Sequence, residues 1–228
     1  MFRLSRNPRD FAFPPVEQAT ADGLLAIGGD LQPGRLLEAY RHGIFPWYNE
    51  EQPILWWSPD PRTVLFPEKL HISRSLKRSL RPDLFTVTFD RCFRDVMIQC
   101  AGPRPQYPES GTWITPAMVE AYTALHEMGH AHSVETWRDG QLVGGVYGVA
   151  IGGAFFAESM FTKVDDASKV ALVTLVRRLH AWGFTIIDCQ QASPHVMRLG
   201  AEEIPRRDFV QRLSSALALL NHRGRWDS

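Results

Sequence analysis

The sequence predicts an α+β fold built from a small N-terminal domain, residues 1–62, and a larger domain, residues 63–228. The first observation is a change of composition, because the segment before residue 62 is rich in Pro, Gly and Trp and contains one short helical pattern. The second is a series of three strand-like segments joined by tight turns and followed by a long helical pattern. Runs of strands followed by helices are typical of α+β domains with an antiparallel sheet.

Composition and charge exclude several classes of protein. Hydrophobic residues make up 44% and charged residues 22% of the 228 residues, which is typical of a globular chain and not of a disordered one. Lys and Arg number 25, as do Asp and Glu, so any nucleic-acid binding must come from a local basic surface. The three cysteines form no CxxC motif, which predicts a reducing compartment. No apolar stretch approaches ~18 residues, so we expect a cytoplasmic protein without a membrane span, and its polar composition favours a monomer.

The N-terminal domain contains one predicted helix. The segment RLLEAYRH, residues 35–42, has a helical pattern that Gly43 ends. Three of the seven tryptophans, Trp47, Trp56 and Trp57, follow close together. We therefore expect the rest of this domain to consist of turns and short strands held together by aromatic packing.

The larger domain begins with a regular series of elements. They are, in chain order, a strand over 63–66, a basic helix over 73–80, a strand over 85–89, a helix over 90–100 and a proline-containing loop around 103–108. Asp90 is the expected N-cap of the helix over 90–100. The next helix is expected to have Thr115 as its N-cap and Pro116 at its first position, and to end at Gly129.

Three antiparallel strands form the clearest stretch of the chain. They are expected over 132–137, 141–151 and 154–161, joined by tight turns at 139–140 and 152–153. A helix over 167–182, a strand over 184–190 and a last helix near 205–220 complete the domain. A meander followed by a long helix, another strand and a final helix is the acetyltransferase-like (GNAT-like) arrangement of an α+β domain, with helices flanking the sheet.

The motif HEMGH, residues 126–130, matches the HExxH pattern of zinc proteases. That chemistry needs both histidines one turn apart in a continuing helix, with Glu127 next to a metal-bound water. Gly129 separates the two histidines and a strand begins directly afterwards, so His130 is expected beyond the helix end. The pattern therefore favours a helix C-terminus at which histidines meet free carbonyl groups, and we expect no metal.

Acyl-CoA chemistry is a second possibility for an acetyltransferase-like domain. Such enzymes hold a pyrophosphate on the backbone N–H groups of a Gly-rich turn at a helix start. The corresponding segment, TKVDDASK, contains Asp165 and Asp166 and no Gly-rich turn. Because an anionic cofactor would meet these carboxylates, we expect no cofactor.

The segment KLHISRSLKRSLR, residues 69–81, is basic and contains no acidic residue. On a helix, Arg74, Lys77, Arg78 and Arg81 would share one face through their i+3 and i+4 spacing. Such a face can follow the phosphates of a nucleic acid. A solvated surface helix is the alternative, and the residues alone do not decide between the two.

Acidic and amide side chains interrupt two apolar strands. Glu158 lies within AFFAESMF, and Asp188 and Gln190 end FTIIDCQ. Because side chains alternate along a strand, Asp188 and Gln190 are expected on one face. A carboxylate among apolar neighbours is costly unless it is paired or used, so these three residues are candidates for a functional site. The alternative is a hydrogen-bonded network at the strand ends.

Several short motifs occur together in a characteristic order. They are GIFPWY, WWSPDPR, TWIT, HEMGHAHSVETW, LVGGVYGVAIGGAFFAESMF, SK, IDCQ and LGAEEIPRRDF, from about Phe13 to Phe209. In this combination the chain resembles the bacterial leucyl/phenylalanyl-tRNA–protein transferases. The resemblance implies an enzyme that transfers Leu or Phe, with leakage toward Met, from Leu-tRNA or Phe-tRNA to the N-terminal Arg or Lys of acceptor proteins. This transfer would create an N-degron for proteolysis.

The resemblance implies roles for the residues at matching positions. Asp188 would polarise Gln190, whose carbonyl oxygen would draw a proton from the α-amine of the acceptor, and Glu158 would help to hold the cationic acceptor. These are the expected catalytic residues. An ester-activated aminoacyl group needs neither ATP nor a metal, so positioning and charge stabilisation can carry the reaction. With a reference pKa near ~8, the amine needs only a modest base.

The resemblance also implies an apolar pocket for the donor side chain. Its expected lining is Trp47, Trp113, Val146, Phe155, Leu172, Leu175, Leu179 and Ile187. The three leucines share one helical face, which their spacing alone would assign to the core. The chain departs from the family at Ser193, where the family often has Asn, and this puts a contact with the terminal adenosine in doubt.

With aminoacyl-tRNA as the donor, the basic face over residues 74–81 is expected to contact tRNA phosphates. Three other functions would give different results. A zinc peptidase would contain stoichiometric zinc, and an acyl-CoA N-acetyltransferase would bind coenzyme A saturably. A non-enzymatic RNA-binding module would bind tRNA without transferring an amino acid.

Overall fold

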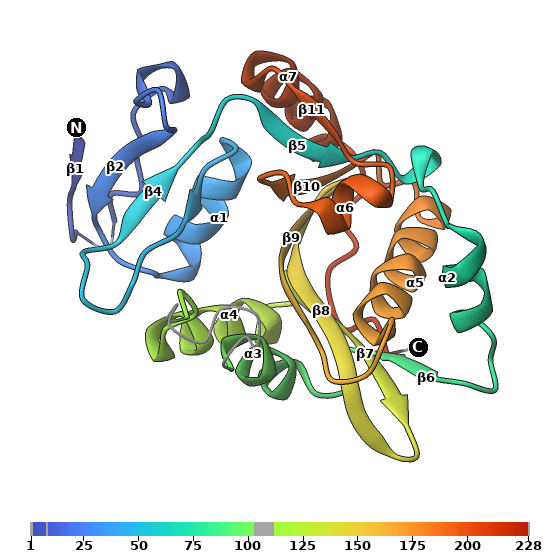
Figure 1. Ribbon diagram of the computed structural model, residues 1–228. Helices are drawn as coiled ribbons and strands as arrows, with labels where there is room; N and C mark the ends of the chain where they lie inside the picture. The colour runs from blue at the N-terminus through green and yellow to red at the C-terminus, as the bar shows by residue number, and fades with distance from the viewer. Residues whose placement is uncertain (1, 8, 103–111, 228) are drawn as a thin grey trace.

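The computed structural model describes residues 2–7, 9–102 and 112–227, and the predicted loop around 103–108 lies outside them. Two sheets and the helices around them make up this part of the chain (Figure 1). Among the described residues, no helix is long and apolar enough to cross a membrane.

The first sheet is small and comes from the N-terminal segment. Its strands, in spatial order, are β1 (Phe2–Leu4), β2 (Leu24–Gly28), β4 (Leu55–Trp57) and β3 (Phe45–Pro46). The helix predicted over 35–42 is confirmed as α1 (Pro33–Arg41), and Gly43 follows it with a φ of +71°. A Cβ at Gly43 would lie 2.8 Å from the ring of Phe209, so this turn requires glycine for close packing as well as for its backbone conformation.

The second sheet has seven strands and holds the predicted meander. Its strands, in spatial order, are β11 (Glu202–Ile204), β5 (Arg62–Leu65), β10 (Ile186–Gln190), β9 (Ala154–Thr162), β8 (Gln141–Ile151), β7 (Ala131–Arg138) and β6 (Thr86–Phe89). The antiparallel pairing of β7 with β8 and of β8 with β9 confirms the meander. Strand β10 is parallel to β9 and antiparallel to β5, so the sheet is mixed.

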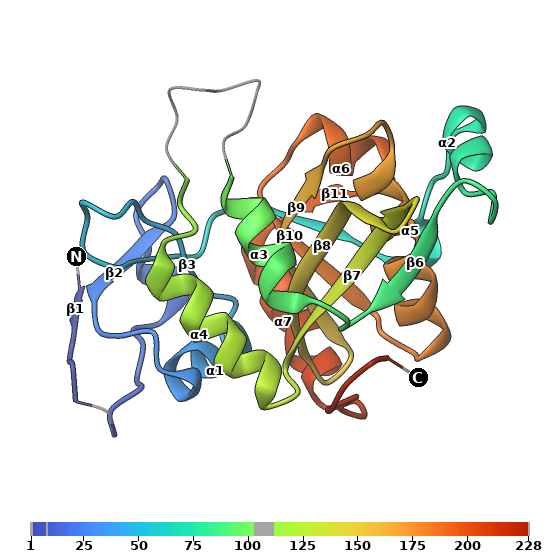
Figure 2. The ribbon, with the colours of Figure 1, turned by 90° about the horizontal axis from the view of Figure 1, so that it is seen from below.

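Helices cover both faces of this sheet, as Figures 1 and 2 show. They are α2 (Arg74–Ser79), α3 (Phe93–Ala101), α4 (Pro116–Glu127), α5 (Ala167–Ala181), α6 (Pro194–Arg198) and α7 (Arg206–Leu217), with short 3-10 turns at Val16–Gln18 and Pro67–Lys69. Side chains of β8 alternate between two hydrophobic clusters: Tyr147 and Val149 pack with residues of α3 and α4, whereas Val146 and Ala150 pack with residues of α5. The predicted α+β architecture with flanking helices is confirmed.

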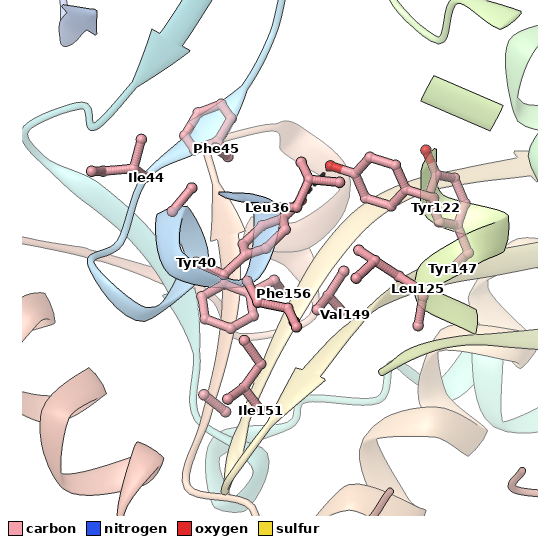
Figure 3. Close-up of a cluster of buried hydrophobic side chains, with 14 of the residues drawn as sticks. Leu36, Tyr40, Ile44, Phe45, Tyr122, Leu125, Tyr147, Val149, Ile151 and Phe156 are labelled. Carbon is pink, nitrogen blue, oxygen red and sulfur yellow. Dashed lines mark hydrogen bonds between the residues drawn. The ribbon is translucent and has the colours of Figure 1, made fainter. Parts of the chain in front are cut away.

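The cluster on the α4 side also contains residues of the N-terminal sheet. Figure 3 shows Tyr40 of α1, Tyr122 of α4 and Phe156 of β9 within it. Strands β1 to β4 precede residue 58, and β5 begins at Arg62. We therefore keep residues 1–62 and 63–228 as the proposed domains, joined through a shared hydrophobic core.

One predicted helix cap is confirmed and another is wrong. The hydroxyl of Thr115 accepts the N–H of Met118, as expected of an N-cap. Helix α3, in contrast, begins at Phe93, and the residue before it is Cys92 and not Asp90. The Asp90 carboxylate instead accepts hydrogen bonds from three groups far along the chain, which are His132 Nδ1 (2.8 Å), the Ser133 N–H (2.9 Å) and the Trp226 N–H (2.8 Å).

The short strands of the N-terminal domain, β1 among them, were expected without bounds, whereas β11 and α6 of the larger domain were not predicted. Each spans at most five residues, which is too short for a periodic pattern to be visible. Helix α6 begins after Ser193, whose hydroxyl accepts the N–H of Val196 at 3.4 Å. Ser193 is therefore the N-cap of α6.

Candidate active site

Two β-bulges lie where strands β9 and β10 separate. Between β8 and β9 the register shifts, so that Glu158 has no partner in the ladder. Between β10 and β5 it shifts at Cys189. The parallel pairing of β10 with β9 ends at Asp188 opposite Phe156, and Gln190 and Glu158 each lie two residues further along their strands. Bulges redirect side chains and are common next to active sites.

The Glu158 carboxylate is the meeting point of four elements. It accepts hydrogen bonds from Gln190 Nε2 of β10 at 3.3 Å, from the Tyr40 hydroxyl of α1 at 2.7 Å and from the Tyr122 hydroxyl of α4 at 3.3 Å. The two tyrosine hydroxyls also contact each other, and because each has one proton, all three contacts are hydrogen bonds only when Glu158 carries a proton as well. Because Nε2 of Gln190 donates to Glu158, its Oε1 is the end of the amide that can face a substrate.

Asp188 forms a buried ion pair instead of contacting the Gln190 side chain. Its carboxylate accepts bonds from Arg62 Nε at 2.8 Å and Nη2 at 2.6 Å, and both side chains are at most 1% exposed. Asp188 Oδ1 also accepts the backbone N–H of Gln190 at 2.9 Å. The guanidinium carbon of Arg62 lies 4.9 Å from the ring centre of Phe45 and 4.6 Å from that of Phe209.

These contacts correct two expectations. The register shift between Asp188 and Gln190, together with a Gln190 φ of +56°, breaks the alternation that was expected to place both side chains on one face. Asp188 therefore acts on the backbone of Gln190, and the expected polarisation of the Gln190 side chain by Asp188 is not the contact present. Asp188 is thus held by the guanidinium of Arg62, whereas Glu158 is held by two hydroxyls and an amide.

Burial shifts the acid–base properties of this cluster. It raises the pKa of Glu158 to about 7, although the hydrogen bond from Tyr40 opposes the rise. Burial and the Glu158 charge also raise the pKa values of Tyr40 and Tyr122 well above their usual range, so both phenols remain hydrogen-bond donors. A carboxyl group with a pKa near neutrality can both accept and release a proton at physiological pH.

The residues predicted to line the donor pocket fall into two groups. Six of them are buried in the hydrophobic cluster on the α5 side of the sheet: Val146, Phe155, Leu172, Leu175, Leu179 and Ile187. Trp113 packs against the cluster on the other side. Trp47 is 40% exposed and makes an edge contact with Trp57, with ring centres 5.8 Å apart. The structure thus brings six of the eight together and leaves the two tryptophans outside that cluster.

The predicted basic helix is shorter than expected. Helix α2 spans six residues, Arg74–Ser79, and carries Arg74, Lys77 and Arg78, which are all exposed. Arg81 lies after the helix and pairs with Asp83 at 2.8 Å. The Ser79 hydroxyl donates to the Asp166 carboxylate at the start of α5 at 2.7 Å, and Leu76 enters the cluster on the α5 side. This basic surface is therefore anchored next to that cluster.

The HEMGH motif has the predicted place at the end of a helix. Helix α4 ends at Glu127, so His130 lies beyond it, as expected. His126 Nδ1 bonds to the Ala131 carbonyl at 2.8 Å, and His130 Nε2 contacts Arg223 at 2.7 Å. Within the described ranges, no three His, Cys, Asp or Glu side chains are grouped so that they could hold a metal ion. Both histidines thus serve to pack this end of the helix.

The start of α5 carries a carboxylate, as the sequence indicates. Asp166 precedes the helix with a φ of +64° and accepts bonds from Lys169 at 2.5 Å and from Ser79 at 2.7 Å. Asp166 is therefore held by a lysine and a serine side chain at the start of α5.

Four residues of the site region were missed by sequence reasoning: Arg62, Tyr40, Tyr122 and Trp226. Arg62 lies 126 residues from Asp188, and Tyr40 lies 118 residues from Glu158. Trp226 packs into the cluster on the α5 side, with its ring centre 6.1 Å from that of Phe155. Arg62 stands in the conspicuous WWSPDPR segment, but nothing in that segment names its partner.

A carboxyl group that titrates near neutrality, an amide and two phenols meet at the point where two strands separate. Such a group can orient an amine and accept its proton while the amine attacks an activated acyl carbon. An α+β domain with this site belongs to the class of acyl-transfer enzymes.

Comparisons with known proteins identify the family. The family model described as leucyl/phenylalanyl-tRNA protein transferase matches residues 64–214, and the model of that family's N-terminal domain matches residues 29–60. The chain belongs to this family and is an aminoacyltransferase.

Relatives match almost the whole chain. The leucyl/phenylalanyl-tRNA–protein transferase of Stutzerimonas stutzeri (strain A1501) is 59% identical over 210 residues, which cover 91% of this chain and 92% of that protein. The enzyme of the same name from Syntrophobacter fumaroxidans (strain DSM 10017 / MPOB) is 55% identical over 227 residues, covering 100% and 95%. Among solved structures, a GCN5-related N-acetyltransferase from Kribbella flavida has a TM-score of 0.37 at 16% identity, covering 75% of this chain and 60% of that one.

Proposed function

We propose that this protein transfers Leu or Phe, with leakage toward Met, from aminoacyl-tRNA to the N-terminal Arg or Lys of acceptor proteins, and thereby creates an N-degron. The names of its relatives support the donor and the protein acceptor. The observation that carries the acceptor preference is the Glu158 carboxylate beside the Gln190 amide. We further propose that the protein acts as a cytoplasmic monomer.

The acceptor presents an α-amine and a cationic side chain. Gln190 Oε1 accepts a hydrogen bond from the α-amine and orients it, while Glu158 holds the positive charge and takes the proton. An amide oxygen is too weak a base to keep a proton, whereas a carboxylate with a pKa of about 7 is matched to an amine with a pKa near ~8. The amine nitrogen then bonds to the ester carbonyl carbon, the bond to the ribose oxygen breaks, and the proton passes to that oxygen.

One assay tests the proposed function. Phe-tRNA carrying labelled Phe is incubated with the protein and a peptide that begins with Arg, and label is measured in the peptide. We expect transfer to this peptide and to one that begins with Lys, and none to a matched peptide that begins with Glu, whose side chain Glu158 would repel. Equal labelling of all three would contradict the proposed acceptor class.

We expect the exposed charges of α2 to bind tRNA phosphates. The double variant Arg74→Glu/Lys77→Glu should weaken the binding of all aminoacyl-tRNAs alike. It should also lower the slope of log affinity against log salt by about one unit for each lost contact. Binding measured by filter retention at several salt concentrations tests this.

The matched control reverses two exposed arginines of the N-terminal segment, Arg3→Glu/Arg6→Glu. Figure 1 places this segment at the opposite end of the molecule from α2, so this double variant should bind tRNA as wild type does. Transfer from aminoacyl-adenosine, which lacks the tRNA phosphates, should be insensitive to both changes. If the α2 variant keeps wild-type affinity and salt slope, the surface of α2 does not bind tRNA.

We expect Leu175 to face the donor side chain. The Leu175→Phe variant removes pocket volume, so kcat/KM for Phe should fall more than kcat/KM for Leu. Overpacking a core position would instead cost about 1–3 kcal/mol of stability and lower both activities together. The control is Val173→Leu, at a buried position of the same helix outside the predicted lining. An unchanged ratio of the two kcat/KM values, with a lowered melting temperature, would assign Leu175 to the core.

A further inference from the structure

We propose that Arg62 is a positioning residue for the transfer reaction, which fixes the catalytic amide of Gln190 through Asp188. This inference deepens the proposed function and rests on it. Arg62 would not touch the substrate, because its side chain is 0% exposed and its guanidinium is held in a two-point ion pair with Asp188.

A continuous series of contacts leads from Arg62 to the acceptor carboxylate. Arg62 binds both oxygens of Asp188, at 2.8 and 2.6 Å. Asp188 Oδ1 accepts the backbone N–H of Gln190 at 2.9 Å, and Gln190 Nε2 donates to Glu158 Oε1 at 3.3 Å. The first two steps are short hydrogen bonds and the last, at 3.3 Å, is longer, so the guanidinium fixes the Gln190 backbone and through it the position of the amide.

The backbone at the end of the series needs such support. Gln190 has a φ of +56°, in the left-handed region that a residue with a side chain rarely adopts. The bulge leaves Cys189 without a partner in the ladder and shifts the register just before Gln190, which pairs with Thr63. A strained backbone of this kind persists only where its surroundings hold it, and the Asp188 carboxylate is the group that accepts the Gln190 N–H.

The guanidinium itself has little freedom. The rings of Phe45 and Phe209 lie 4.9 and 4.6 Å from its central carbon, and its planar fork matches the two carboxylate oxygens. Lysine would keep the charge in this place but could not reproduce the two parallel hydrogen bonds of the planar guanidinium. Because a buried ion pair contributes little net stability, the pair is better explained by the geometry that it imposes.

The chain offers a matched control in Arg35. Its side chain is 1% exposed and pairs with both oxygens of Asp30, at 3.1 and 3.3 Å, and its guanidinium lies 5.6 Å from the ring centre of Phe11. It belongs to α1 and holds the N-terminal segment, away from Gln190.

The experiment compares Arg62→Lys and Arg35→Lys with wild type, using melting curves and transfer kinetics with Phe-tRNA and the Arg peptide. We expect Arg62→Lys to lower kcat by about 10–100-fold with KM for Phe-tRNA within twofold, because misplacing a catalytic group slows the reaction without weakening donor binding. Arg35→Lys should lower the melting temperature to a similar degree and keep kcat.

The inference is overturned if Arg62→Lys retains kcat within twofold, or if Arg35→Lys loses as much. If Arg62→Lys fails to fold, the Phe209→Leu variant replaces it in the test, because it removes one of the two rings that contact the guanidinium. A fall in kcat of about threefold or more with unchanged KM supports the inference, and an unchanged kcat overturns it. The wild-type protein in the same assay separates the role of Arg62 from the proposed function. If wild type transfers no Phe to the peptide, the proposed function itself is overturned.

Discussion

The Glu158→Gln variant is expected to lower the rate of amino-acid transfer by about 10²–10⁴-fold, the usual contribution of general acid–base catalysis. Glutamine keeps the size of the side chain and one acceptor oxygen for the bonds from Tyr40 and Gln190. It cannot take a proton from the acceptor amine or balance its charge. Single-turnover transfer from labelled Phe-tRNA measures the effect, and Glu203→Gln, at an exposed position of β11, is the control.

The pH dependence of transfer should report the same group. Because the pKa of Glu158 is about 7, wild-type kcat/KM for the acceptor should show a limb below pH 7 that adds about tenfold per unit to the fall caused by protonation of the acceptor amine. In Glu158→Gln this limb should disappear, which leaves only titration of the acceptor amine near ~8. If the pH profile of wild type shows a single pKa near ~8 and the profile of Glu158→Gln is the same, Glu158 is not the proton acceptor.

The free energy of unfolding should also depend on the protonation of Glu158, but it should fall with rising pH where transfer activity rises. The folded-state pKa of Glu158 lies above the usual value of 4.5, so the folded protein binds the proton more tightly than the unfolded chain does. The free energy of unfolding of wild type, compared with that of Glu158→Gln, should therefore decrease as the pH rises from 4.5 to about 7. Urea denaturation at several pH values measures this difference.

The Asp188→Ala variant is expected to lose about 3–5 kcal/mol of stability as well as transfer activity, because it leaves the Arg62 guanidinium buried without a partner. We therefore do not expect the fold to be spared by this substitution. The matched comparison is Glu202→Ala, which breaks the exposed ion pair with Lys69. It should cost at most about 1 kcal/mol.

A double variant separates stability from catalysis at this pair. Arg62→Met/Asp188→Leu replaces both charges with apolar side chains, which is often neutral or stabilising at buried ion pairs. We expect it to regain most of the stability lost by Asp188→Ala but not the transfer activity. Recovery of both would show that Asp188 serves only to pair Arg62.

The sequence by itself determined the elements that local patterns specify. The Asp-Gly turn at 139–140, the Gly-Gly turn at 152–153 and the strand-like runs beside them predicted the meander. The Thr115–Pro116 pair predicted the start of α4. It also singled out Glu158, Asp188 and Gln190, because polar residues within apolar strands are conspicuous without any partner in view. The family followed from the order of motifs along the chain.

The tertiary structure alone decided how these residues are used. A bulge depends on the hydrogen-bond register between two strands, so the sequence of neither strand predicts it. The bulge at Cys189 brings the backbone N–H of Gln190, and not its side chain, to Asp188. The partners Arg62 and Tyr40 come from more than 100 residues away, brought there by the packing of β5 and α1. The prediction of Asp90 as a helix N-cap was wrong for the same reason, because its carboxylate accepts hydrogen bonds from N–H groups that are distant in the sequence. Local signals fix elements, whereas the partner of a buried charge depends on which groups the folded core brings within hydrogen-bond distance.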